Sequence, residues 1–513
     1  MGETLARCPA CRTCFYERRD SYDYEDPAAS DLLLQFNLEQ NAGIHHQTRP
    51  LFALEGVGSV LDVGCGFGFT VDLAASLLGW RAVGVDPSFY AAAGRKALGA
   101  DIRQEYLSEA TDLGGRFDLV LASEVLEHLP EPHDFLALLR SHLSPAGTLV
   151  LSTPDADAIA PTIGAARLLA ILAPRVHLVL FSRDSLARAL QRAGFAHVRV
   201  TSAGDGLLAY ASDRPLRFRA DAEPRHNDAY QRYLEILLDR AAPGTPLWNG
   251  AAGRLLTWRM PVVAAATLNA LFSRIAKAWR ATFGIDLAKP RLPDPLPPGP
   301  LRPFNLASVL LARAALVART TGRSPAAILA YARPAYRIAL HTGRALQAAN
   351  MVDHDLRATA QRARMLVVDA LAELAPELEA SLLAGLLQPS PGDLAEWTDP
   401  AIDALTPRLA LAFAAAVAAD QHDEARRLEP ALGNLDELSR ILDGSDEVLL
   451  RTLFALGVQR LDADADAALS AFRRMQAEAR LRLHRGPAIA DLLHLAEEHM
   501  TIATDRIRHH GEA

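Results

Sequence analysis

The stretch that decides the fold is "SVLDVGCGFGFTVDLA", residues 59–74. An apolar run ends in three glycines, Gly64, Gly66 and Gly68, and a second apolar-periodic segment follows at once. Glycine adopts positive φ readily and lets a ligand approach the backbone, so this loop suits a molecule packed tightly against it. The loop lacks the third glycine of a Gly-x-Gly-x-x-Gly dinucleotide fingerprint, and it lacks the Gly-Lys-Ser/Thr of a phosphate loop. It therefore predicts a strand–loop–helix unit that holds another kind of ligand.

Short β-rich runs alternate with helical segments after this loop. The expected strands are 57–63, 81–86, 100–106, 117–123 and 147–153, and two later runs, 197–203 and 207–213, are expected to pair as an antiparallel edge. Strands separated by helices form βαβ units. The sequence therefore predicts an α/β fold with a doubly wound, mainly parallel, seven-stranded sheet.

Asp86 closes the second expected strand, about 20 residues beyond Gly64. A carboxylate at this place can accept hydrogen bonds from both ribose hydroxyls of an adenosyl group. The glycine loop alone is weak support for a ligand site. Together with Asp86 and the βαβ context it strongly favours one.

Strand patterning ends near residue 213, and helical segments rich in alanine, leucine and arginine continue from there. The run 289–303 holds seven prolines in fifteen residues, which predicts a stiff, extended linker. We expect a cysteine-containing arm (1–30), an α/β domain (31–212), a helical extension (213–288), this linker, and a helical domain (304–513). The last part is either an ordinary all-α domain or an irregular array of tetratricopeptide-like repeats.

The charge and the apolar content of the chain argue against some kinds of binding partner and location. A net charge of -8 argues against nucleic acid or an anionic membrane as the main partner. The sequence contains no uncharged apolar run of about 18 residues, so no transmembrane helix is expected. The first residues lack the apolar core of a signal peptide, and four cysteines do not make a disulfide framework. A cytoplasmic protein is the expectation.

Four runs carry a family resemblance: "VLDVGCGFG", "VGVDPS", "FDLVLASEVLEHLPEP" and "LSPAGTLVLSTPD". They resemble the class I S-adenosylmethionine-dependent methyltransferases, and in particular the bacterial branch with the EVLEHL signature, over roughly residues 30–210. The resemblance implies S-adenosylmethionine as cofactor. It implies that the loop under the methionine portion consists of Asp62, Gly64, Cys65, Gly66 and Gly68, and that Asp86 binds the ribose. The residues near the adenine would be Pro87, Ser88 and Glu105. The cofactor and the acceptor would meet at Ser123 and Glu124.

Methyl transfer requires an enzyme to align the acceptor and to exclude water. An oxygen acceptor also loses a proton as it attacks, so a base assists. His128, His177 and Glu124 are the candidate catalytic residues, and a loop-fixing role is the alternative for His128. Cys65 is expected to pack within the loop rather than act as a nucleophile.

The run "CPACRTC" places Cys8, Cys11 and Cys14 near the start of the chain. The resemblance implies a zinc ribbon, which needs two Cys-x-x-Cys pairs, and the sequence holds no second pair. Tetrahedral zinc takes four ligands, so His45 or His46 would have to complete a site with the three cysteines. A ribbon that has lost its metal is the alternative.

The sequence thus predicts a methyltransferase that acts on an oxygen of a sugar, a glycan precursor or another small metabolite. The Asp/Asn-Pro-Pro-Tyr/Phe run of amino-group methylases is absent after the fourth strand. One alternative is a helical interaction scaffold with a vestigial or regulatory methyltransferase domain. Another is a protein methyltransferase whose helical region holds the target.

Overall fold

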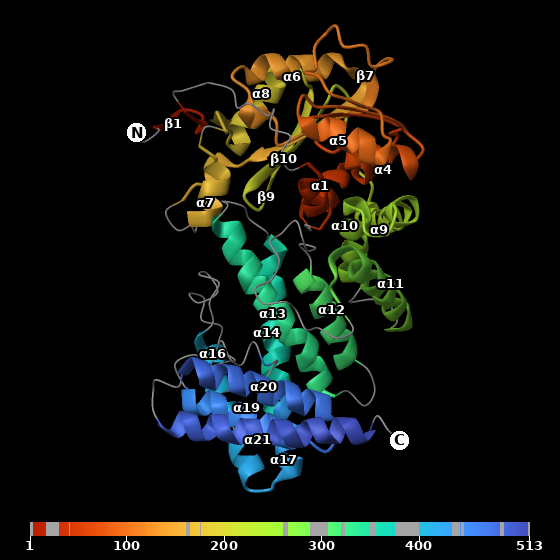
Figure 1. Cartoon of the computed structure of the whole chain (residues 1–513). Coiled ribbons are helices and arrows are strands. Elements are labelled where there is room, and N and C mark those ends of the chain that lie inside the picture. Colours follow the sequence, from red (N-terminus) through yellow and green to blue (C-terminus); the bar gives the residue numbers. More distant parts are fainter. Residues whose placement is uncertain are drawn as a thin grey trace. The chain divides into compact units, whose positions relative to one another are not determined.

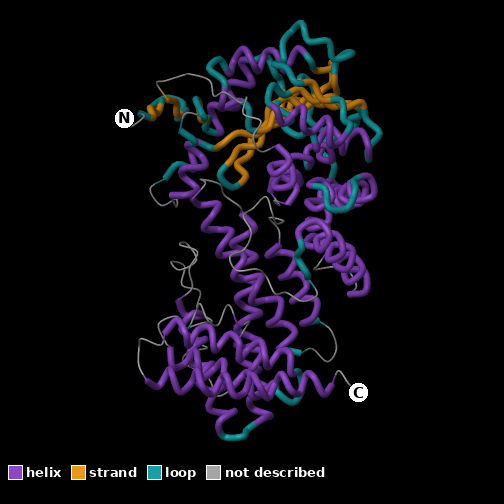
Figure 2. Tube along the Cα trace, viewed as in Figure 1, coloured by secondary structure: helices purple, strands orange, loops and turns teal. Residues whose placement is uncertain are grey.

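The computed structural model describes residues 4–16, 30–39, 42–160, 165–174, 176–259, 265–287, 306–319, 324–348, 354–374, 400–432, 435, 442, 446–482 and 487–510. The chain divides into two compact units, Met1–Leu255 and Leu256–Ala513. Strands lie in the first unit, whereas the described part of the second is helix and loop (Figures 1 and 2). The predicted domain boundaries stay predictions, and the proline-rich run 289–303 lies outside the described residues.

A seven-stranded sheet forms the centre of the first unit, in the order β5-β4-β3-β6-β7-β10-β9. β3 pairs in parallel with β4 and β6, β4 with β5, and β6 with β7, while β10 is antiparallel to both β7 and β9. The predicted α/β fold class is confirmed, with β9 as the outermost strand of the antiparallel pair. The strands are β3 (Ser59–Val63), β4 (Arg81–Val85), β5 (Ile102–Arg103), β6 (Phe117–Ser123), β7 (Leu143–Pro154), β9 (His197–Ala203) and β10 (Gly206–Ser212).

Burial explains where the strands begin and end. All five residues of β3 are buried because helices cover both faces of the sheet at its centre. β5 is much shorter than the predicted strand 100–106. Ile102 is buried there, whereas the three residues that follow Arg103 are exposed, so this edge of the sheet stops early.

Helices follow or precede the strands as a doubly wound sheet requires: α4 (Phe69–Ser76), α5 (Phe89–Leu98), α6 (Pro132–Ser141) and α8 (Arg183–Arg192). Three helices precede β3: α1 (Ser30–Glu39), α2 (Ala42–Thr48) and α3 (Pro50–Ala53). Ser182 caps α8 through a reciprocal pair of hydrogen bonds with Ser185. Between β7 and α8 lie η2 (Ala156–Ala158), α7 (Ala165–Leu172) and the short strand β8 (Val179–Leu180).

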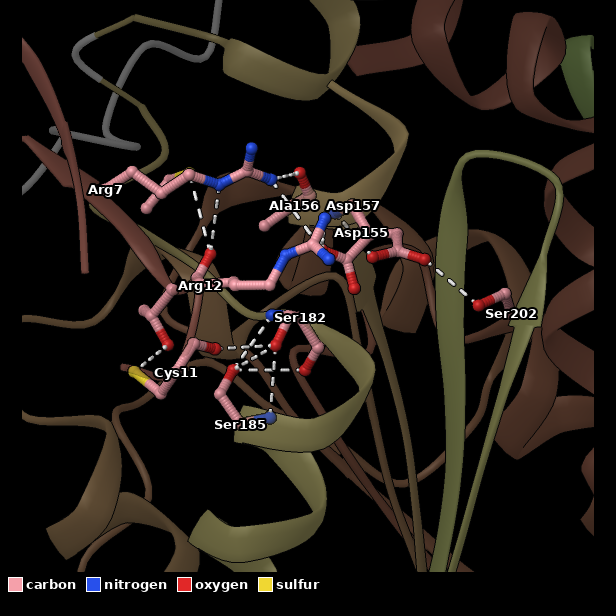
Figure 3. A network of polar contacts seen from close by, with 11 residues as sticks. Arg7, Cys11, Arg12, Asp155, Ala156, Asp157, Ser182, Ser185 and Ser202 are labelled. Carbon is pink, nitrogen blue, oxygen red and sulfur yellow. Dashed lines mark hydrogen bonds and ion pairs between the residues drawn. The ribbon is translucent and has the colours of Figure 1, made fainter. Parts of the chain in front are cut away.

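The cysteine arm forms a β-hairpin, which the sequence analysis did not anticipate. Its strands β1 (Leu5–Arg7) and β2 (Cys14–Tyr16) join β8 in a second, three-stranded sheet. Arg7 donates a hydrogen bond to the carbonyl of Ala156 (2.7 Å), and Arg12 forms an ion pair with Asp157 (2.8 Å; Figure 3). The hairpin is thus fastened to the segment that follows β7.

Helix α9 (Ala222–Arg240) lies beyond the last strand and still belongs to the first unit. Its Tyr233 hydroxyl donates to Asp72 on α4 (2.7 Å), and the Arg240 guanidinium makes two hydrogen bonds to the same carboxylate. Asp72 is almost fully buried. α9 therefore clamps the helix that starts at the glycine loop.

The second unit is built from paired helices. Its helices are α11 (Ala265–Phe283), α12 (Leu306–Ala318), α13 (Pro325–Ala348), α14 (His354–Leu374), α16 (Pro400–Ala418), α17 (His422–Leu428), α19 (Asp446–Arg460), α20 (Ala465–Arg482) and α21 (Pro487–His510), and α10 (Pro246–Arg259) crosses the division between the units. Gly457 on α19 faces the ring of Phe472 on α20, where a Cβ would come within 2.3 Å of the ring. Glycine there lets α19 and α20 pack closely. Within the described residues, every helix is too short or too polar to span a bilayer.

Candidate functional site

The glycine loop has two packed positions and one open position. Gly64 and Gly68 have φ values of 74° and 75°, and a Cβ would lie 2.4 Å from a methyl group of Val125 at the first and 2.3 Å from Ile102 at the second. Gly66 also has positive φ (53°), but nothing lies within 4 Å of its Cβ position. The backbone at Gly66 is therefore the face of the loop that a ligand can approach.

Asp86 connects this loop to the helix after β4. Its carboxylate accepts hydrogen bonds from the backbone N–H of Gly66 (2.8 Å), from that of Ser88 (2.8 Å) and from the Ser88 hydroxyl. Ser88 is the N-cap residue of α5, and Pro87 lies half-buried between the two. A carboxylate offers about four lone-pair sites, so Asp86 keeps capacity for a ribose hydroxyl.

Asp62 lies at the end of β3 beneath the loop and is 6% exposed. Burial, and then the charge of Asp86, raise the pKa of Asp62 to about 7. A cation bound above the loop would stabilise the ionised form of Asp62. Burial also raises the pKa of Cys65, whose sulfur lies against Gly84, so this thiol is a packing group rather than a nucleophile.

A cluster of two carboxyl groups and two imidazoles lies beside the loop. It consists of Glu124, Glu127, His128 and His177. Glu124 directly follows β6 and has φ 55°, a left-handed conformation that costs free energy for a residue other than glycine. Val125, which contacts Gly64, sits inside this sequence and joins the cluster to the loop.

Two residues at the end of β7 orient the carboxyl groups. The Ser152 hydroxyl donates to Glu124 Oε1 (2.7 Å), and the Thr153 hydroxyl donates to Glu127 Oε2 (2.9 Å). Glu127 is fully buried. Burial raises the pKa of both carboxyl groups, and the charge of Glu124 raises that of Glu127 further.

The tautomers of the two histidines follow from their hydrogen bonds. His128 Nδ1 lies 2.9 Å from the carbonyl of Val176, and His177 Nδ1 lies 2.7 Å from that of Ile171. A carbonyl only accepts, so Nδ1 of each ring carries the proton. Nε2 of His177 is then an acceptor, whereas His128 makes a second hydrogen bond, with the backbone of Glu124. Burial lowers the pKa of His128, and burial lowers that of His177 to about 4, so both rings are neutral at pH 7. Their centroids are 5.0 Å apart.

This arrangement fits a divalent metal ion. One ligand atom each of Glu127, His128 and His177 lie within 4.8 Å of one another. Glu127 Oε1 is buried with no hydrogen-bond partner among the described residues, 3.6 Å from His128 Nε2. Nδ1–H donation to a backbone carbonyl is how metal-binding histidines are commonly oriented. A cation here would compensate the buried carboxylate.

The other predicted site residues lie apart from this cluster. Glu105 is exposed in the loop after β5, and Ser123 is the last residue of β6. Cys8, Cys11 and Cys14 lie in the hairpin, and across the described part of the chain the one group with metal-ligand spacing is the cluster just described. The structure thus does not gather the three cysteines into a ligand set, and a zinc site there stays a prediction.

The sequence analysis missed Glu127, Ser152 and Thr153 as site residues. A signal existed, because the two glutamates of "EVLEH" stand three residues apart after a strand. Nothing in the sequence pairs them with hydroxyl groups on β7.

Part of the first unit matches a known family model. Residues 32–200 match the family model described as "Methyltransferase domain". This part of the chain is similar to a methyltransferase domain, as the resemblance in its sequence predicts. The matched residues include β3 to β7 and the cluster of Glu124, Glu127, His128 and His177, and the match ends within β9.

Several curated proteins are similar to part of this chain. The ubiquinone biosynthesis O-methyltransferase of Azorhizobium caulinodans is 36% identical over 114 residues, which are 21% of this chain and 44% of that protein. The mitochondrial enzyme of that name from Mus musculus is 32% identical over 148 residues, 26% of this chain and 39% of its own. The chain spans about half or less of the length of these relatives. Among solved structures, an S-adenosylmethionine-dependent methyltransferase from Aquifex aeolicus is 20% identical and covers 35% of this chain and 97% of its own, with a TM-score of 0.27.

Proposed function

We propose that this protein transfers a methyl group from S-adenosylmethionine to an oxygen atom of a small-molecule acceptor. The observation that carries the proposal is the adjacency of two features. The open backbone at Gly66, hydrogen-bonded to Asp86, lies next to a group of proton acceptors of which Glu127 and His177 are buried, and Val125 against Gly64 links the two.

The chain's own groups have separable tasks in this reaction. Gly66 and Asp86 bind the adenosyl and methionine portions, and ionised Asp62 stabilises the positive charge of the cofactor. The acceptor hydroxyl lies beside the cluster, loses its proton to Glu124, or to an imidazole Nε2 that holds no metal ion, and attacks the methyl carbon in line with the leaving sulfur. The methyl group moves to oxygen, and S-adenosylhomocysteine leaves as a neutral thioether.

A divalent ion held by Glu127, His128 and His177 would lower the pKa of an acceptor hydroxyl when bound. The acceptor is a hydroxyl of a sugar, a glycan precursor or another small metabolite. The curated relatives are O-methyltransferases, which supports oxygen as the methylated atom. A protein target held by the helical unit is the rival assignment within the same chemistry.

Calorimetric titration tests the cofactor site. We expect S-adenosylmethionine and S-adenosylhomocysteine to bind the wild type, and Asp86→Ala to lose the binding. Asp101→Asn is the matched control, because this carboxylate is 60% exposed at the same edge of the sheet and pairs loosely with Arg103. A folded wild type that binds neither ligand would refute the enzyme assignment and favour the interaction scaffold.

Methyl transfer is measured with labelled cofactor on small-molecule and protein fractions of a lysate. Label in small molecules supports the proposal, whereas label confined to protein favours the rival. Glu127→Gln and His177→Gln should abolish incorporation while cofactor binding persists, because the cluster acts on the acceptor.

A further inference from the structure

A cavity lies on the first unit, at the tip of the N-terminal hairpin. Its volume is about 480 Å³. Cys8 and Cys11 line it from the hairpin, and Arg188 and Arg192 line it from consecutive turns of α8. Its other titratable groups are Glu131 and His133, at the start of α6, and Phe15, Val179 and Phe181 add apolar wall. The methyl-transfer reaction uses none of these residues.

The hairpin turn fixes the two thiols side by side. The Arg12 N–H donates to the Cys8 carbonyl (2.8 Å), and the Cys8 N–H donates to the Thr13 carbonyl (2.9 Å). The Cys11 carbonyl accepts from the Ser182 hydroxyl at the N-cap of α8 (2.9 Å; Figure 3). The turn is therefore anchored at both ends, and it presents residues three apart to one cavity.

The surroundings of Cys11 lower the pKa of its thiol. Hydrogen bonds with Thr13 lower the pKa of Cys11 most, and the neighbouring Cys8 thiol and the charge of Arg188 lower it further. Cys14 is its opposite: it is buried in β2, away from the cavity, and burial raises its pKa. A thiolate is the nucleophile in thiol–disulfide exchange, so Cys11 is the reactive member.

We propose that Cys11 and Cys8 form a thiol–disulfide exchange site for small anionic disulfides, such as a disulfide of a carboxylate-bearing peptide. The Cys11 thiolate attacks one sulfur of the bound disulfide and releases one half as a thiolate. The Cys8 thiolate then attacks Cys11 in the mixed disulfide, the second half leaves as a thiolate, and Cys8–Cys11 becomes the oxidised pair. Arg188 and Arg192 hold carboxylates of the disulfide, and Glu131 is the one acidic residue among the described residues that line the cavity.

Trypsin makes the test specific, because Arg7 and Arg12 flank the pair and the peptide 8–12 carries both thiols without Cys14 or Cys65. The reduced full-length protein is treated with oxidised glutathione, quenched with acid, digested and weighed. We expect peptide 8–12 to become about 2 Da lighter, because two hydrogens are lost. Cys8→Ser should stop at a mixed disulfide on Cys11, and Cys14→Ser should behave as the wild type.

The charge of the cavity is tested by comparing disulfides. Arg188→Ala should slow the reaction with oxidised glutathione about 2- to 5-fold, as expected for one exposed charge, and leave the rate with neutral hydroxyethyl disulfide unchanged. Equal slowing with both disulfides would overturn the anionic specificity. Failure of Cys8 and Cys11 to oxidise would overturn the exchange site. It would also be overturned if both thiols bind zinc and react only after a chelator has removed the metal. Neither result depends on methyl transfer.

Discussion

Removal of the Arg240 side chain tests whether α9 clamps the cofactor domain. Asp72 is buried, with 4% of its side chain exposed, and its partners are the guanidinium of Arg240 and the hydroxyl of Tyr233. Breaking a buried ion pair from one side costs about 3–5 kcal/mol. Arg240 is 35% exposed, so water replaces part of the interaction, and about 2–3 kcal/mol remains for Arg240→Met. Since about 2–4 °C corresponds to 1 kcal/mol in a unit of this size, the melting temperature should fall by about 4–12 °C.

Differential scanning calorimetry of the full chain measures this fall, and α9 itself supplies the control. Arg225 on the same helix pairs with Asp221, and both side chains are more than half exposed. Arg225→Met should change the free energy of unfolding by less than about 1 kcal/mol. Adding Asp72→Asn to Arg240→Met should recover part of the loss, because the unpaired buried charge disappears. If Arg240→Met melts like Arg225→Met, the clamp is not a stabilising contact and the reasoning is wrong.

Four further predictions concern the site. Affinity for S-adenosylmethionine should rise as pH rises through about 7 and then level off, because Asp62 must ionise to stabilise the positive charge of the cofactor. Isothermal titration at a series of pH values should show this rise, and Asp62→Asn should abolish the pH dependence. The free energy of unfolding should decline as pH falls from about 6.5 to about 4, because His177 takes up a proton in the unfolded chain but stays neutral where it is buried in the folded chain. Thermal melts of His177→Gln should lack this part of the decline. Treatment with a chelator should lower methyl transfer and leave cofactor binding intact, and a divalent ion should restore the activity of the wild type but not that of Glu127→Gln. Gly66→Ala should lower the free energy of unfolding by about 1 kcal/mol, because the backbone at Gly66 has positive φ. It should also weaken cofactor binding, measured by calorimetry, at least tenfold. Unchanged binding would show that Gly66 does not face the cofactor.

The sheet could be predicted from the sequence because its strands are local, apolar and separated by helices with clear ends. The glycine loop and Asp86 could be predicted for a related reason: each stands at the end of a strand, and parallel strands place such ends at one edge. The same logic brought Glu124 and His128 to this edge beside the loop. Their assigned roles stay proposals.

What could not be predicted depends on contacts between distant residues. Ser152 and Thr153 look like ordinary strand residues until β7 pairs with β6 and places them beside two glutamates. The hairpin is equally hidden, because three-residue strands carry almost no periodic signal and β8 lies far along the chain. Zinc at the three cysteines was implied by the family resemblance, and a resemblance does not say which way side chains point.

The second sheet has a consequence for how the chain is made. The ribosome synthesises β1 and β2 before β3 to β7, and their partner β8 comes after all of these. The nascent hairpin therefore stays without its third strand while the central sheet forms, with Cys14 and Tyr16 not yet covered. Docking of the hairpin is expected to be a late event in biogenesis, which depends on completion of the segment that carries His177.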